Sequence, residues 1–524
     1  MKLAHRLTRW LACIPFILCG CAHLPDRPTL PVETVAPVAA DAPLDRVIGP
    51  AETAHPGESG FRLVIEGTEA FVLRAHSAQV AQRNLDVQTY IWHADPTGLF
   101  LAQRLLDAAD RGVKVRLLVD DMDARAKNDG FAAIAAHPNI EVRMFNPFAT
   151  RSGGLRLAGE GARDFDRINR RMHNKSWIAD NRIALVGGRN LGDEYFAASD
   201  EVNFVDLDFV MVGPVVRDVS ASFDHFWNSV SVWPIEALDA EAVNEAALAK
   251  LRTKLAEKAA EGEDSRYAKT LREDDGIRRL VSGDWQLQWS AEYRFVSDDP
   301  AKVTMEKRDA SRAVVGAAVA QMVRAASQSL EIISPYFVPG KKGTEGLTGR
   351  VQAGASVKIL TNSLAANDVA SVHGGYSRHR KELIKGGVQL WELKPAKTAE
   401  TKAKEGESKA TGSSAPGSSG ASLHTKALTA DGVTVFVGSY NLDPRSTWLN
   451  CEQGVIVQNA ALAQQVSRIF ALQTQGNRAW HVTLEKGGLR WSDGTQIVDE
   501  EPGATFGKKF QAWFAKAFHL DAQL

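Results

Sequence analysis

The chain is short of cysteine, carries no excess of charge of either sign and has no long apolar run. Three of its four cysteines lie within the first 21 residues, and the fourth is Cys451. This distribution excludes a disulfide-stabilised fold and a zinc site built from cysteines. The 62 lysines and arginines nearly balance 63 aspartates and glutamates, which leaves a net charge of −1. Such a chain has no broad electrostatic surface for nucleic acid, and we expect no nucleic-acid partner.

The first 21 residues have the pattern of a bacterial export signal. Three basic residues precede an apolar stretch, residues 11–18, that is too short to span a bilayer, and no run of transmembrane length occurs elsewhere in the sequence. The stretch ends in Leu18-Cys19-Gly20-Cys21, which resembles the lipobox of bacterial lipoproteins. In that pattern the last cysteine is lipidated and becomes the mature N-terminus. The alternative is an ordinary secretory signal that is cleaved without lipidation.

Lipidation at Cys21 predicts where the protein acts. Several acyl chains on one residue anchor a protein firmly to a membrane. We therefore expect a lipid-anchored protein of the bacterial cell envelope that faces the periplasm. Ala22, directly after the cysteine, favours the outer membrane over the inner membrane. Residues 22–58 are rich in proline and small residues, which is typical of a flexible tether.

The rest of the sequence repeats one plan twice. Each copy contains an apolar strand, a helix and two further apolar strands in the same order. The matching pairs are Leu85–Tyr90 with Leu330–Tyr336, Leu99–Arg111 with Gly346–Gly354, Val113–Val119 with Val357–Leu360, and Ile140–Phe145 with Val388–Leu393. Alternating strands and helices predict an α/β fold, and the weak period-two pattern indicates strands that are buried on both faces.

The repeat divides the chain into segments. A first half at 59–238 and a second half at 284–475 flank a helical connection at 239–283. The second half contains an insertion, 396–422, that has no aromatic residue and is predicted to be disordered. Residues 476–524 form a C-terminal segment with an amphipathic helix, 506–520, that either packs against the domain or lies on a membrane interface.

A histidine, a lysine two residues later and an aspartate five residues after the lysine occur twice. An asparagine follows each histidine at the same offset of seventeen residues. The residues are His173, Lys175, Asp180 and Asn190 in the first half, and His424, Lys426, Asp431 and Asn441 in the second half. His379-Arg380-Lys381 has the first two residues of the pattern, but Gly386 stands where the aspartate belongs. We therefore do not count His379 as a third copy.

These residue types suit displacement at a phosphodiester. Imidazole titrates near neutral pH, so two facing histidines can supply a nucleophile or base on one side of phosphorus and an acid on the other. Two ammonium groups can stabilise the charge on the phosphoryl oxygens, and the asparagines can donate hydrogen bonds to the same oxygens. Because the lysines then do the electrostatic work of a metal pair, we expect neither a metal nor a cofactor.

The two copies resemble the duplicated HKD signature of the phospholipase D superfamily. The resemblance implies two halves related by a pseudo-twofold axis, each a central mixed sheet flanked by helices, with one shared active site. It also implies that His173 is the nucleophile that forms a phosphohistidine, and that His424 is the general acid and afterwards the base. Asp180 and Asp431 would brace the loops that carry the motifs.

In that superfamily a later carboxylate orients each imidazole. In the second half this residue is Glu452, which precedes the apolar strand Gly454–Val457. In the first half, matching of the strands gives Asp206 the same role. Glu201 has the sequence offset of Glu452 but lies in a polar turn, so it is the second candidate.

The wider sequence is similar to bacterial cardiolipin synthases of the branch without N-terminal transmembrane helices, notably at Gly112–Asp121 and Gly187–Phe196. The similarity implies phospholipid substrates and transfer of a phosphatidyl group, through phosphohistidine, to a hydroxyl of phosphatidylglycerol. We expect a monomer. Four arginines before the first motif are either headgroup ligands or a solvated basic loop, namely Arg163, Arg167, Arg170 and Arg171. The alternatives are a hydrolytic phospholipase D, a nuclease of the same superfamily and a non-catalytic lipid-binding scaffold.

Overall fold

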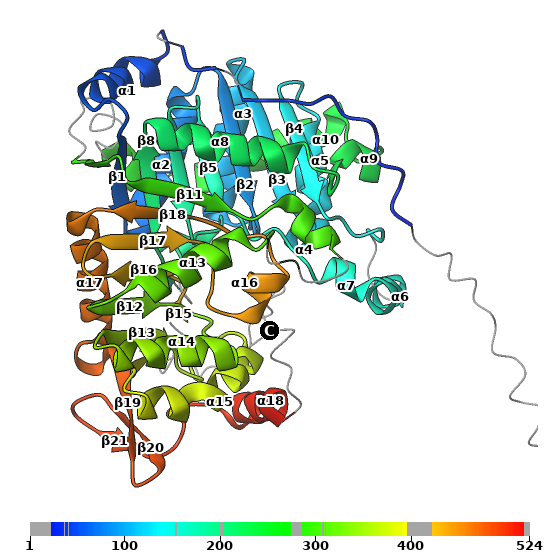
Figure 1. The fold of residues 1–524 in the computed structure, drawn as a ribbon. Coiled ribbons are helices and arrows are strands. Elements are labelled where there is room, and N and C mark those ends of the chain that lie inside the picture. Colours follow the sequence, from blue (N-terminus) through cyan, green and yellow to red (C-terminus); the bar gives the residue numbers. More distant parts are fainter. Residues whose placement is uncertain are drawn as a thin grey trace, which may run out of the picture.

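Two large mixed sheets, one from each half of the sequence, form the frame of the protein (Figure 1). The computed structural model describes residues 23–35, 37–39, 41–151, 155–199, 203–263, 265–273, 286–305, 309, 311–395 and 422–517. The predicted export signal with Cys21, almost all of the insertion (396–421) and Glu201 lie outside these residues.

The first sheet has nine strands in the order β10-β1-β8-β6-β5-β2-β3-β4-β9. The strands are β1 (Ser59–Val64), β2 (Asn84–Thr89), β3 (Lys114–Asp120), β4 (Ile140–Phe145), β5 (Ser176–Ala179), β6 (Ile183–Gly187), β8 (Asp208–Val212), β9 (Val232–Pro234) and β10 (Gln288–Ser290). Strands β2, β3 and β4 are parallel, and the other neighbours are antiparallel. All residues of β2 are buried, which explains why its apolar residues do not alternate.

The second sheet has ten strands in the order β11-β18-β17-β16-β12-β13-β14-β19-β20-β21. The strands are β11 (Tyr293–Ser297), β12 (Ser329–Ile333), β13 (Ser356–Asn362), β14 (Gln389–Leu393), β16 (Ala427–Ala430), β17 (Thr434–Gly438), β18 (Gln453–Gln458), β19 (Ala479–Glu485), β20 (Gly488–Ser492) and β21 (Ile497–Val498). Strands β12, β13 and β14 are again the parallel ones. The predicted duplication and the α/β fold class are therefore confirmed strand by strand.

Helices cover both faces of each sheet. The first outer face carries α2 (Gly67–Val80), α3 (Pro96–Asp110), α5 (Asn128–Ala135) and α10 (Glu245–Glu261). The second outer face carries α13 (Val314–Ala325), α14 (Gly340–Gln352) and α15 (Ala370–Lys385). The inner faces carry α8 (Pro214–Trp227) and α17 (Ala460–Thr474). Shorter helices are α4 (Asp121–Ala124), α6 (Leu155–Arg163), α7 (Phe165–Ile168), α9 (Ile235–Leu238), α11 (Arg266–Glu273) and α16 (Pro444–Trp448).

The two halves share one hydrophobic core. A single buried cluster contains Phe61 and Val186 from the first sheet together with Val437 and Val455 from the second. A two-stranded parallel sheet of β7 (Phe204–Val205) and β15 (Ser422–Leu423) also joins the halves. Apolar burial and backbone pairing therefore both fix the position of one half against the other.

Two predicted boundaries need correction. Strand β10, although it lies after residue 284, pairs with β1 at the edge of the first sheet. The second half therefore starts with β11 rather than at residue 284. Strands β19, β20 and β21 extend the second sheet beyond β14, so the start of the predicted C-terminal segment belongs to the second half. In the first sheet, β9 occupies the place that β19 has in the second.

The prediction of a flexible tether at 22–58 is wrong for the residues that the structure describes. The Arg27 side chain donates hydrogen bonds to the carbonyl oxygens of Val232 (2.8 Å) and Ser229 (3.0 Å). Further on, helix α1 (Pro43–Ala54) buries Leu44 and Ile48 against the first half. Proline makes this segment extended, and these contacts hold it on the protein surface.

The predicted C-terminal amphipathic helix is present as α18 (Phe506–Ala517), and it packs against α15. Within the described residues, no helix combines the length and the apolar character needed to cross a bilayer.

Candidate active site

Each His-Lys-Asp motif lies at a hairpin. His173 and Lys175 precede β5, and His424 and Lys426 precede β16 in the same way. Each aspartate sits in the tight turn after its strand, with φ of 53° for both Asp180 and Asp431. The two motifs are therefore equivalent in backbone conformation as well as in sequence.

The motif aspartates bind backbone and lie away from the histidines. The Asp180 carboxylate accepts hydrogen bonds from the amides of Gln82, Arg83 and Asn84 at 2.7–3.2 Å. Asp431 does the same for residues 327–329 at 2.7–3.1 Å. Both carboxylates thus hold the chain that enters the first parallel strand, which is the bracing role expected from the sequence.

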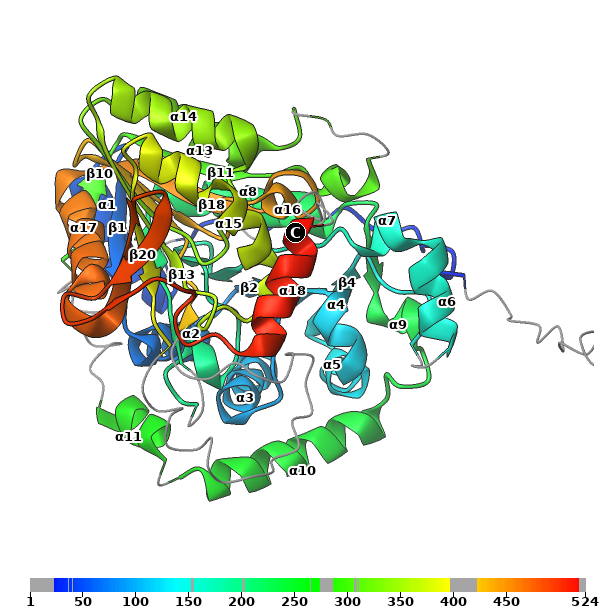
Figure 2. The ribbon, with the colours of Figure 1, turned by 90° about the horizontal axis from the view of Figure 1, so that it is seen from below.

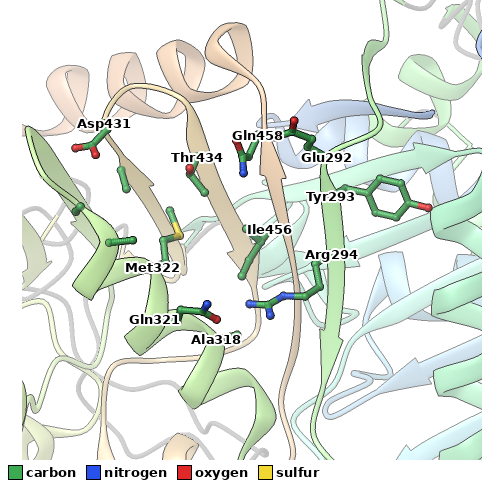
Figure 3. Close-up of a pocket in the computed structure, with 13 residues that line it drawn as sticks. Glu292, Tyr293, Arg294, Ala318, Gln321, Met322, Asp431, Thr434, Ile456 and Gln458 are labelled. Atoms are coloured by element: carbon green, nitrogen blue, oxygen red, sulfur yellow. The ribbon is translucent and has the colours of Figure 1, made fainter. Parts of the chain in front are cut away.

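Asp431 also borders an open pocket of about 370 Å³. The pocket lies between α13 and strands β11, β17 and β18, and Figure 3 shows Asp431 at one end of it. Its lining, among the described residues, contains neither a histidine nor a lysine of the motifs. This pocket is therefore separate from the candidate active site.

Each motif imidazole is hydrogen-bonded to a carboxylate of the other half. Nδ1 of His173 lies 2.9 Å from Glu452, and Nδ1 of His424 lies 2.6 Å from Asp206. Both carboxylates are fully buried, whereas the two histidine side chains are 12% and 14% exposed. The histidines are thus the groups of this cluster that a substrate can reach.

This exchange corrects the expectation that each carboxylate orients the histidine of its own half. The cause is the backbone. The His173 amide donates to the Cys451 carbonyl at 2.8 Å, and the His424 amide donates to the Val205 carbonyl at 2.9 Å. Each histidine therefore follows a segment of the opposite half, and the next residue of that segment is the carboxylate.

The two carboxylates have different neighbours at equivalent positions. A Cβ at Gly188 would lie 2.2 Å from Oδ1 of Asp206, so only glycine leaves room for that carboxylate. The equivalent residue in the second half is Ser439, whose hydroxyl donates to Glu452 at 2.5 Å. One half holds its carboxylate by close packing, and the other half uses an additional hydrogen bond.

The two lysines are buried and lie beneath the histidines. Nζ of Lys175 donates to the His173 carbonyl at 2.7 Å, and Nζ of Lys426 donates to the His424 carbonyl at 2.5 Å. Burial is the main cause that lowers the pKa of Lys175 to about 7 and that of Lys426 to about 8. The charges of Glu452 and Asp206 partly offset this effect of burial on both lysines, and an anionic phosphate beside the two ammonium groups would offset it further.

The charges of the two halves act on one another. Burial, followed by the charges of Lys175 and Lys426, holds the pKa of His173 well below its usual value. Burial and Lys426 lower the pKa of His424 to about 4, against the opposing effect of Asp206. Lys175 also acts on His424. The two motifs therefore form one electrostatic site, in which burial and the lysines favour neutral imidazoles.

The carboxylates differ in protonation. Burial raises the pKa of Glu452 to about 7. Burial also acts on Asp206, but His424 and Lys426 outweigh it and lower the pKa of that carboxyl. Asp206 is therefore ionised at neutral pH and favours a protonated His424, whereas Glu452 gives His173 weaker support for a second proton.

The asparagines are buried at the same site. The Asn190 amide donates to the Tyr195 hydroxyl at 2.8 Å, which leaves one amide hydrogen for another acceptor. The side-chain oxygen of Asn441 has no hydrogen-bond partner within the described part of the chain. A phosphate role for these residues stays a prediction.

The sequence did not identify the aromatic residues that contact the histidines. The Tyr90 ring meets His173 edge-on at 5.1 Å, and the Tyr195 ring meets His424 edge-on at 5.3 Å. Tyr90 ends the first predicted strand, and Tyr195 lies in the stretch Gly187–Phe196, so both were visible as sequence features. Their position beside the histidines depends on the fold.

Three of the four arginines before the first motif, Arg167, Arg170 and Arg171, bond to distant parts of the fold and do not form a free basic loop. Arg171 is fully buried and contacts Asp120 at 3.2 Å. Arg167 donates to the Pro147 carbonyl at 2.7 Å, and Arg170 donates to the Met305 carbonyl. Arg163 pairs with Asp164 at 2.8 Å. These bonds fix the loop that leads to His173.

Two other groups among the described residues have the spacing of metal ligands. In the first, His93 is paired with Glu194 at 3.1 Å, and Asp95 caps α3 through the Gly98 amide. The second group is His373, Glu392 and Glu501, and the Arg380 side chain lies among them and donates to Glu501 at 2.8 Å. Neither group includes a motif histidine, and both have internal partners.

The sequence is similar to a family model and to proteins of known name. A family model described as "Cardiolipin synthase, PLD-like domain" matches residues 76–227 and 319–473. The chain is 41% identical over 478 residues to Cardiolipin synthase C of Escherichia coli (strain K12), a match that covers 90% of this chain and 98% of that protein. It is 24% identical over 412 residues to Cardiolipin synthase A of Pseudomonas syringae pv. syringae (strain B728a), covering 78% and 67%.

The fold also matches a solved structure. The crystal structure of phosphatidylserine synthase from Haemophilus influenzae Rd KW20 is similar with a TM-score of 0.56, over 91% of this chain and 100% of that chain. The sequence identity is 12%, so this likeness concerns the fold alone.

Proposed function

This chain belongs to the cardiolipin synthase family of phospholipase D-like proteins, and from that membership we propose that it is a phosphatidyltransferase that makes cardiolipin. Phosphatidylglycerol would be the acceptor, and a second phospholipid would donate the phosphatidyl group. The observation that most supports this reaction is the pairing of His173 with Glu452 and of His424 with Asp206. It gives one site two oriented imidazoles with unlike carboxylate partners.

The first step forms a phosphohistidine. In the tautomer whose Nδ1 hydrogen faces Glu452, 2.9 Å away, the Nε2 lone pair of His173 is free to attack phosphorus. As the nitrogen–phosphorus bond forms, the bond to the headgroup oxygen breaks, and His424 gives that oxygen a proton. Lys175 and Lys426 stabilise the charge on the two non-bridging oxygens.

The second step transfers the phosphatidyl group. His424, now neutral, accepts the proton of a phosphatidylglycerol hydroxyl, and the hydroxyl oxygen attacks phosphorus. The nitrogen–phosphorus bond breaks, and His173 returns to its starting state. Water at the acceptor position would instead release phosphatidic acid, so exclusion of water favours transfer.

The order of the two histidines follows from their carboxylates. The nucleophile must be neutral, and the pKa of His173 is held well below its usual value by burial and the two lysines. The acid must gain a proton when the anionic substrate arrives. His424 is better placed for this because its partner Asp206 is ionised and only 2.6 Å away.

We also propose that the protein is attached to the cell envelope through lipidated Cys21, that it faces the periplasm, and that the outer membrane is its location. This proposal follows from the lipobox-like sequence Leu18–Cys21 and from Ala22. The mass of the mature N-terminal peptide tests it, because a peptide that begins at any other residue, or that lacks acyl chains, contradicts the anchor.

The test of the reaction is the product formed from defined lipids. The purified protein is given phosphatidylglycerol with and without phosphatidylethanolamine, and the products are identified by mass spectrometry. We expect cardiolipin, with loss of at least a thousandfold in His173→Ala and His424→Ala. His379→Ala is the matched control, because it removes the histidine of the incomplete motif, and it keeps full activity. Phosphatidic acid as the main product would favour the hydrolase, and no product with folded protein would remove the proposal.

A further inference from the structure

Helix α18 presents two opposite faces. Ala512 and Ala515 are buried against α15, whereas Phe506, Phe510 and Trp513 are 85%, 53% and 59% exposed. At about 100° per residue, the buried and exposed residues lie on opposite sides of the helix. Figures 1 and 2 both show α18 on the outside of the second half, beside α15. The packing prediction therefore holds for one face, and the other face is left to solvent.

The docked face is built closely. A Cβ at Gly374 of α15 would lie 2.4 Å from the Ala512 carbonyl oxygen, so glycine and alanine let the two helices approach. Nζ of Lys508 donates to the carbonyls of Ala365 and Asn367 at 2.8 and 2.9 Å. Small residues and the half-buried Lys508 hold α18 in one orientation, and that orientation fixes where the aromatic residues point.

Helix α18 is also hydrogen-bonded to the segment that leads to Asp368. Lys508 holds the segment 365–367, and the next residue, Asp368, accepts a hydrogen bond from the Tyr336 hydroxyl at 2.8 Å. Asp368 is one of the carboxylates whose charge acts on Lys426. A short path of covalent and hydrogen bonds thus joins α18 to Asp368, and the charge of Asp368 acts on Lys426.

The exposed face has the chemistry of a membrane-interface helix. Large apolar side chains that are exposed elsewhere in the described residues are mostly single aliphatic ones, but α18 gathers four aromatic ones, Phe506, Phe510, Trp513 and Phe514, on one side. Lys509 and Lys516 lie along one edge of these aromatic side chains, and residues 506–517 contain no acidic residue, although Lys509 approaches Glu500 at 3.7 Å. Aromatic rings that insert at the headgroup level with lysines at their edge are typical of helices that lie on anionic lipid surfaces.

We propose that the face formed by Phe506, Phe510 and Trp513, here called the aromatic face, binds the surface of an anionic phospholipid bilayer. The choice of partner rests on the proposed phospholipid substrates, but the binding itself does not require the chemistry. Contact at this face would place the loop 365–368, and the site beside it, next to lipid. This attachment is independent of Cys21, since it lies at the opposite end of the chain.

Tryptophan quenching tests the contact directly. The full chain is mixed with vesicles of phosphatidylglycerol and phosphatidylcholine whose acyl chains carry bromine, which quenches tryptophans that insert. We expect Trp513→Phe to remove most of the quenching. Trp233→Phe, at a strand edge of the first half, is the matched control and keeps it. Because all three proteins share one N-terminus, an acyl anchor cannot produce the difference. Equal quenching in the three proteins would overturn the proposal.

Vesicle sedimentation gives the strength of the contact. For protein produced without acylation of Cys21, we expect Phe510→Ser and Trp513→Ser each to weaken partitioning roughly tenfold, as loss of one inserted aromatic side chain does. Ile497→Ser removes another exposed apolar side chain, which is 61% exposed, and leaves partitioning unchanged. Unchanged melting temperatures show that the variants fold. If Phe510→Ser instead converts a dimer to a monomer without changing partitioning, the face binds a second copy and the proposal fails.

The proposed reaction and the proposed surface contact can be refuted independently of one another. In detergent micelles with dispersed lipid, the aromatic-face variants keep wild-type activity, whereas His173→Ala has none. Quenching at Trp513 with no cardiolipin formed would remove the proposed function and leave this contact standing. Cardiolipin formation without any Trp513-dependent quenching would remove the proposed contact and leave the proposed function standing.

Discussion

Replacing the orienting carboxylates one at a time separates the roles of the two histidines. Asp206→Asn keeps the size of the side chain and removes the charge beside His424. Glu452→Gln keeps the size of the side chain beside His173 and removes a carboxyl that is only partly ionised at neutral pH, because burial raises its pKa to about 7. A hydrogen bond to a charged group contributes about 1.5–3 kcal/mol. That range corresponds to a rate loss of roughly 10- to 100-fold. With phosphatidylglycerol as donor, we expect both variants to lose activity within it.

A donor with an activated headgroup makes the two variants differ. In phosphatidyl-p-nitrophenol the leaving oxygen departs without a proton, so formation of the phosphohistidine no longer depends on His424. We expect Asp206→Asn, like His424→Ala, to release about one p-nitrophenol per site in a burst and then to accumulate the intermediate. Glu452→Gln slows the burst, because its histidine is the nucleophile.

The burst is followed by stopped-flow absorbance, and the phosphohistidine by mass spectrometry of peptides after alkaline quench. The expected modified residue is His173. Circular dichroism and melting temperature show whether each variant is folded. If Glu452→Gln keeps the burst while Asp206→Asn abolishes it, each carboxylate acts within its own half or the histidine roles are reversed. Mass spectrometry of the modified residue then tells these two cases apart, and either result refutes the reasoning.

Three further predictions follow from single contacts. Gly188→Ala lowers kcat by at least tenfold because its Cβ displaces Asp206, whereas Gly349→Ala, which has open space around it, is the neutral control. Lys175→Met abolishes activity but raises the melting temperature at pH 7. Burial lowers the pKa of Lys175 from 10.5 to about 7, so the wild type gains stability as pH rises from about 7 to 10.5, and the variant does not. Equal pH dependence of unfolding in the two proteins would contradict this prediction. Burial acts to raise the pKa of Asp431, but hydrogen bonds from the backbone outweigh it and lower this pKa from 3.8 to about 2. The contribution of this carboxylate to the stability of the folded state is therefore present above pH 3.8 and lost as pH falls toward 2. In Asp431→Asn we expect a loss of about 1 kcal/mol at pH 7, since water screens this partly exposed carboxylate, and no loss near pH 2 in urea unfolding.

Much of the fold was predictable because the sequence contains the same order of strands and helices twice. The strands β2 and β12 and the hairpins at Asp180 and Asp431 occur at matching positions, and duplication distinguishes a true signal from a chance pattern. The tether was not predictable in the same way. Its proline content indicates an extended chain, but nothing local shows that Arg27 bonds the carbonyls of Ser229 and Val232. The environment of the arginines near residue 170 was not predictable for the same reason. The sequence of a basic segment is the same whether its side chains are solvated or one of them, Arg171, pairs with Asp120.

The pairing of histidines with carboxylates shows most clearly what a repeat leaves open. Matching the strands identifies Asp206 and Glu452 as equivalent residues, but equivalence is the same whether each acts on its own copy or on the other. The choice is made by long-range backbone pairing of Met172 with Cys451 and of β7 with β15, which no local pattern records. Because of this exchange, either half alone would hold a histidine without its buried carboxylate. The site therefore depends on both halves for each imidazole, and the duplication cannot be reduced to one copy without losing the orientation that the chemistry needs.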